Sequence, residues 1–187
     1  MEKRAYELFK ELEKSAKFFK SGNAMKLRNH SNEIIRHAAL ENSKELALIA
    51  MVSYVLHKLM TKEHIVGHVK WKANKASLLN ALQAALSALQ AGNLKKFESS
   101  MNSFDRQLQK IDSYFSRFVQ SLMHKARVKY AADAYFFGLS MSSAAELTGA
   151  ERKGLQEYIG ATTVNDKEKQ VKGIQDRLNK LKEVLKE

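Results

Sequence analysis

The sequence contains no proline, and this absence constrains the fold more than any other feature of the chain. Proline marks turns and strand edges in loop-rich folds, so a chain without it favours helices joined by short connections. Five of the eight glycines fall between segments of helical periodicity, where C-caps and tight turns need them. These five are Gly22, Gly92, Gly138, Gly149 and Gly160. We therefore predict an all-α protein.

Apolar residues recur at steps of three and four through the first half of the chain, as on one face of a helix. The third predicted helix is apolar around most of its circumference, which places it in the middle of a core. The fourth is weakened by Gly67, and Asn74 is a candidate break. The predicted helices cover about residues 2–20, 24–41, 44–59 and 62–91.

The longest apolar repeat comes next and alternates steps of three and four without a miss. It consists of Leu94, Phe97, Met101, Phe104, Leu108, Ile111, Phe115, Phe118 and Leu122. The short turn at Gly92 and Asn93 predicts an antiparallel hairpin with the preceding helix. A seam inside a multi-helix bundle is the favoured interpretation, and a dimeric coiled coil is the alternative.

A last helix is expected over about residues 166–186, with an apolar stripe from Val171 to Leu185. A helix of this length relies on packing for its stability in water. It is therefore expected to dock on its own domain or on a second copy of the chain, which would make a homodimer. The predicted domains are a helical bundle over residues 1–137 and a second domain over 138–187.

The formal net charge is +12, and the sequence pI is about 9.8. Charge of this size indicates a polyanionic partner and does not indicate a fold. One stretch, from residue 117 to 130, is basic and contains no acid. Its charged side chains are Arg117, Lys125, Arg127 and Lys129, and we expect them to bind phosphates of a nucleic acid.

No set of residues predicts catalysis, a cofactor or a metal site. Cysteine is absent, which excludes disulfides, thiolate zinc sites and cysteine nucleophiles. His64 and His68 have the spacing of a helical metal pair, but no third ligand accompanies them. His30 and His37 lie near arginines, although not at the spacing of helical ribonucleases. We expect a protein that is not an enzyme and holds no cofactor.

The N-terminus opens directly into a charged amphipathic helix and has no signal-peptide core. The most apolar stretch, residues 46–60, contains Lys58 and is short for a membrane span. A cytoplasmic protein without a membrane partner is the resulting expectation.

Residues 140–160 carry the most informative motif. Ser143 and Glu146 are spaced as a capping box that would start a short helix. Ala145 is small where two helices would cross, and Gly149, four residues later, suits a tight turn. Leu155 and other apolar residues then return from a following helix. This order of residues is the steric pattern of a helix-turn-helix.

The stretch 144–149 resembles the A-A-x-L-x-G opening of helix-turn-helix motifs in small prokaryotic DNA-binding proteins. The motif covers residues 144–160, and the helical body before it is similar to uncharacterised archaeal helical proteins. The resemblance implies that Arg152, Lys153 and Gln156 lie at the exposed start of a recognition helix, facing the major groove.

The leading functional prediction is a non-enzymatic nucleic-acid-binding protein, a helix-turn-helix DNA-binding regulator or architectural factor. Duplex DNA is favoured over RNA as the partner. Two alternatives stay open. One is an RNA- or ribosome-associated factor that uses the same basic surfaces. The other is an antitoxin-type adaptor whose motif contacts protein.

Overall fold

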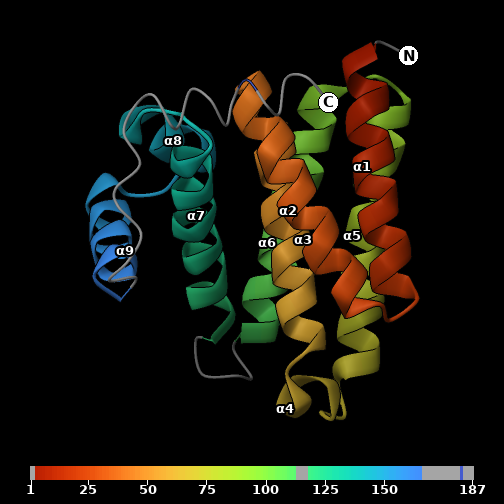
Figure 1. Ribbon diagram of the computed structural model, residues 1–187. Coiled ribbons are helices and arrows are strands. Elements are labelled where there is room, and N and C mark those ends of the chain that lie inside the picture. Colours follow the sequence, from red (N-terminus) through yellow and green to blue (C-terminus); the bar gives the residue numbers. More distant parts are fainter. Residues whose placement is uncertain (1–2, 113–117, 166–181, 183–187) are drawn as a thin grey trace. The chain divides into compact units, whose positions relative to one another are not determined.

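The computed structural model describes residues 3–112, 118–165 and 182, and all regular elements in these residues are α-helices (Figure 1). The order is α1 (Lys3–Lys20), α2 (Ala24–Glu41), α3 (Lys44–Met60), α4 (Glu63–Val66), α5 (Trp71–Gln90), α6 (Leu94–Asp112), α7 (Phe118–Phe136), α8 (Met141–Thr148) and α9 (Arg152–Asn165). The prediction of an all-α fold is confirmed for this part of the chain. The predicted docking helix and its stripe lie outside the described residues.

Two compact units make up the chain. Residues 1–31 and 52–123 form the first unit, and residues 32–51 and 124–187 form the second. The units interleave along the sequence, whereas the expected domains are two consecutive segments. The boundary expected near residue 137 stays a prediction.

The first unit is built around α5, which packs against both α1 and α6 (Figure 1). The apolar repeat of α6 is buried here, with Phe97, Phe104 and Leu108 at most 1% exposed. These side chains follow one another at helical spacing, so they form one face directed into the core. Phe115, from the same repeat, lies outside the described residues.

Among the polar side chains buried in the core of the first unit, Ser15, Ser53 and His57 find partners there. Ser15 donates to the carbonyl of Glu11, and its Oγ lies 2.7 Å from the hydroxyl of Ser53. His57 donates from Nδ1 to the carbonyl of Ala24 at 2.9 Å. Burial lowers the pKa of His57, and the hydrogen bond to Ala24 opposes this shift. These bonds satisfy groups that would otherwise destabilise the core.

The fourth predicted helix breaks earlier than expected. The backbone leaves helical geometry after Val66 and resumes it at Trp71, so Asn74 lies inside α5. A local hydrogen bond replaces the helical pattern between them, because the N–H of Lys70 donates to Nδ1 of His68. Gly160 likewise lies within α9 and does not mark a break.

Candidate nucleic-acid interface

Ser140 caps the N-terminus of α8, and the predicted capping box of Ser143 and Glu146 is wrong. The Ser140 hydroxyl accepts a hydrogen bond from the backbone N–H of Ser143, which is already inside the helix. Glu146 instead forms an ion pair with Lys44 of α3 at 2.9 Å. The hydrogen bond from Lys44 lowers the pKa of the Glu146 carboxyl. Serine is a favoured N-cap residue at either position. The helical backbone begins at Met141, so Ser140 is the cap.

Gly149 ends α8 in the left-handed conformation, with φ of +68°. Its N–H donates to the carbonyl of Ala145, and the N–H of Ala150 donates to the same carbonyl at 3.0 Å. A residue with a Cβ would be strained at this φ, which explains glycine at the turn. The chain then turns within two residues and begins α9 at Arg152.

Buried apolar residues join α8 and α9, which pack against each other. Ala144 and Leu155 are fully buried, and Leu147 is 3% exposed. A further contact involves α7, since a Cβ built on Gly154 would meet the Val128 side chain at 3.7 Å. The inward face of α9 is therefore set by Gly154 and Leu155.

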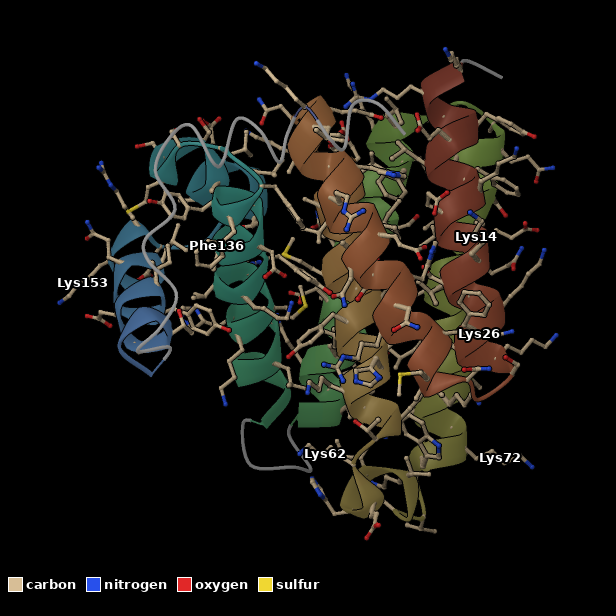
Figure 2. All side chains as sticks on the ribbon, viewed as in Figure 1. Lys14, Lys26, Lys62, Lys72, Phe136 and Lys153 are labelled. Atoms are coloured by element: carbon tan, nitrogen blue, oxygen red, sulfur yellow. The ribbon has the colours of Figure 1, made fainter. Side chains whose placement is uncertain are left out.

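The three α9 residues singled out from the sequence are all exposed. Arg152, Lys153 and Gln156 lie on the first turns of the helix, around the buried Leu155. Lys153 points outward from α9 (Figure 2). Residues three or four apart share a helix face, so Gln156 lies beside both Arg152 and Lys153. This face presents two cationic hydrogen-bond donors and one amide to solvent.

The basic residues of α7 do not form one surface. Lys125 and Arg127 are exposed but two positions apart, so they project from different sides of the helix. Lys129 is half-buried, forms an ion pair with Asp133, and lies 4.4 Å from the Tyr130 ring centroid. Its charge is therefore already compensated within the protein. Arg117 lies outside the described residues.

Two basic residues that the sequence did not single out also belong to the second unit. Arg36 of α2 is exposed and lies 5.8 Å from the ring centroid of Phe137. Lys44 of α3 pairs with Glu146, as described above. Both are about a hundred positions away from their partners, and no local pattern connects them. The fold alone identifies them.

The structure also bears on the histidines noted in the sequence and on Trp71, the single tryptophan of the chain. Within residues 3–112, 118–165 and 182, no group of three potential metal ligands occurs. Trp71 is half-buried and meets Phe19 edge-to-face, with ring centroids 6.3 Å apart. This contact places the Trp71 ring at the edge of the core.

No protein-family model, curated protein or solved structure matches this chain. None of the helices in the part of the chain that the structure describes is long and apolar enough to cross a membrane.

Proposed function

We propose that the chain is a non-enzymatic nucleic-acid-binding protein, with α8 and α9 acting as a helix-turn-helix on duplex DNA. In this proposal α9 is the recognition helix, and the protein serves as a regulator or architectural factor. The α5–α6 pair would be the antiparallel hairpin of the supporting bundle. A homodimer would suit a two-fold DNA site, although the stripe expected to form it lies outside the described residues.

The main support for the proposal is the contrast between buried and exposed side chains at the start of α9. Leu155 is fully buried, whereas Arg152, Lys153 and Gln156 around it are exposed. The buried residue fixes the helix, and its neighbours stay accessible to a ligand. Arginine and lysine bind guanine in the major groove, and glutamine binds adenine. The net charge of +12 supplies the attraction to phosphates on which DNA affinity largely depends.

RNA is the second candidate partner, and the placement of the α7 residues favours it. Lys125 and Arg127 project from different sides of α7 and cannot both follow one straight backbone. An irregular RNA can fold around such a surface, because its strands change direction at loops and bulges. Comparison of duplex DNA with structured RNA at equal salt distinguishes the two partners.

If Arg152 or Gln156 contacts a base, changing that residue to alanine is expected to weaken binding to a preferred duplex by about 1–3 kcal/mol. Binding to unrelated duplexes should change little for Gln156→Ala, since the amide carries no charge. Fluorescence anisotropy on sites enriched by selection from random duplexes measures both affinities. Lys95→Ala, an exposed change in the first unit, is the control. Equal losses on preferred and unrelated sequences would exclude base reading by α9.

Removing both Lys125 and Arg127 is expected to weaken binding to all duplexes. Each lost phosphate contact should flatten the slope of log affinity against log salt by about 0.9. Because the two side chains project from different sides of α7, only one of them can contact a straight duplex, so the double alanine variant should lower the slope by up to about 0.9. Lys129→Ala should lower it less, because this side chain is paired with Asp133. An unchanged slope in the double variant would mean that Lys125 and Arg127 face solvent and do not contact the DNA.

A further inference from the structure

A second concentration of positive charge lies in the first unit. Residues 17–28 and 57–75 together contain nine lysines and arginines and one acid, Glu63. Most of the protein's net charge therefore comes from two short stretches that are far apart in sequence.

The fold brings these two stretches together at one end of the first unit, which we call the basic end. Lys75 at the start of α5 donates to the carbonyl of Lys20 at the end of α1, at 3.2 Å. His57 near the end of α3 bonds the carbonyl of Ala24 at the start of α2. Lys26, Lys62 and Lys72 lie towards the same end of the unit (Figure 2).

Some lysines of the basic end make contacts within the protein, and others are exposed to solvent. Lys75 is half-buried, bonds the end of α1, and lies 5.5 Å from the Phe19 ring centroid. In contrast, Lys20, Lys26 and Lys72 are exposed. Like charges gathered at one end of a unit repel one another, and a bound anion reduces this repulsion. The arrangement therefore favours a ligand with several negative charges.

The side chains at the basic end fit phosphates better than a bilayer. Lysine ammoniums bind phosphates as point charges and read no base sequence. Helices that bind membrane surfaces usually place tryptophan, phenylalanine or leucine in the bilayer. Here Trp71 packs inward on Phe19, and the exposed apolar side chains, Met25, Val66 and Val69, include none of these three residue types.

We propose that the basic end is a second nucleic-acid surface, which holds the phosphate backbone of a duplex without reading its sequence. This inference rests on the proposed function in one respect, since both surfaces would bind the same class of polymer. It adds a site on another unit, formed by the ends of α1 and α3 and the starts of α2 and α5.

The test compares two triple variants of the full chain that remove the same charge. One is Lys20→Ala, Lys26→Ala and Lys72→Ala at the basic end. The other is Lys3→Ala, Lys95→Ala and Lys96→Ala, which are exposed at the starts of α1 and α6. The probe is a fluorescent duplex of random sequence, titrated at several salt concentrations. Circular dichroism of each variant checks that its helices are retained.

The basic-end variant should lower the salt slope by up to about 2.7, at about 0.9 for each lost contact. The control variant should lower it clearly less. Equal changes in both variants would mean that net charge alone attracts DNA, and would overturn the inference. Loss of binding to phosphatidylglycerol vesicles, with the DNA slope unchanged, would overturn it in favour of an anionic bilayer.

Arg152→Ala separates this inference from the proposed function. If Arg152→Ala loses affinity for the preferred site and the basic-end variant has no effect, the result would support the α9 site and exclude the second surface. The reverse pattern would leave the basic end as the DNA surface and remove α9 as the reading helix. Absence of DNA binding by the unchanged chain would overturn both.

Discussion

Replacing Phe104 with alanine is expected to destabilise the first unit by about 3–5 kcal/mol, the usual range for a buried phenylalanine. Phe104 is 1% exposed and lies between Phe97 and Leu108 on the buried face of α6. Its removal would leave a cavity in a unit where α5 packs on both α1 and α6, and the packed core cannot fully close such a cavity.

Urea unfolding monitored by Trp71 fluorescence measures this effect. Trp71 is the single tryptophan of the chain and packs on Phe19 in the same unit, so its emission reports the first unit. Ser99→Ala, an exposed change on α6, is the matched control and should stay within about 0.5 kcal/mol of the unchanged protein. A loss below about 1 kcal/mol for Phe104→Ala would mean that the α6 face is not a well-packed core.

Leu155→Ala is expected to destabilise the second unit by about 2–5 kcal/mol and to weaken DNA binding with it. Leu155 is fully buried on α9, beside the small residue Gly154 that faces Val128 of α7. Without this anchor α9 would no longer be held at one orientation. Its exposed side chains would then have to be ordered on binding, which costs affinity.

The adjacent residue provides the control for Leu155→Ala. Gln156 is exposed, so Gln156→Ala should leave stability within about 0.5 kcal/mol and affect only preferred-site affinity. Hydrogen exchange of the α9 amides distinguishes the two variants. Faster exchange is expected for Leu155→Ala and unchanged exchange for Gln156→Ala. Similar exchange in both variants would contradict the anchoring role of Leu155.

Local sequence patterns predicted most of the helices well. The second helix was predicted at residues 24–41, and α2 occupies Ala24–Glu41. Turn chemistry explains this agreement, since Gly22 has φ of +78° and Asn23 accepts a bond from the N–H of Lys26. Such signals act within one turn of a helix and are readable from neighbouring residues.

Local sequence patterns also predicted the turn at Gly149 and the exposure of Arg152, Lys153 and Gln156. It failed at the start of α8, where two serines were both acceptable caps. The backbone there has helical geometry from Met141, so Ser140 caps the helix and Ser143 lies within it. The sequence alone could not show whether Ser140 or Ser143 is the cap, because both residues are serine.

Interactions between distant segments could not be predicted from the sequence. The pairing of Lys44 with Glu146 joins residues about a hundred positions apart. The basic end is a similar case, since its two stretches meet only because α1 and α3 end there and α2 and α5 begin there. The charge of each stretch was visible in the sequence, but their proximity depends on the packing of the first unit.

The central claim is that this chain binds nucleic acid through its positive surfaces, and one measurement tests it most directly. The full, unchanged protein is titrated with a fluorescent duplex from about 50 to 200 mM salt. We expect measurable binding at the low-salt end and a steep fall in affinity as salt rises, because each neutralised phosphate releases counterions. Undetectable binding at low salt, or affinity that does not change with salt, would contradict the account.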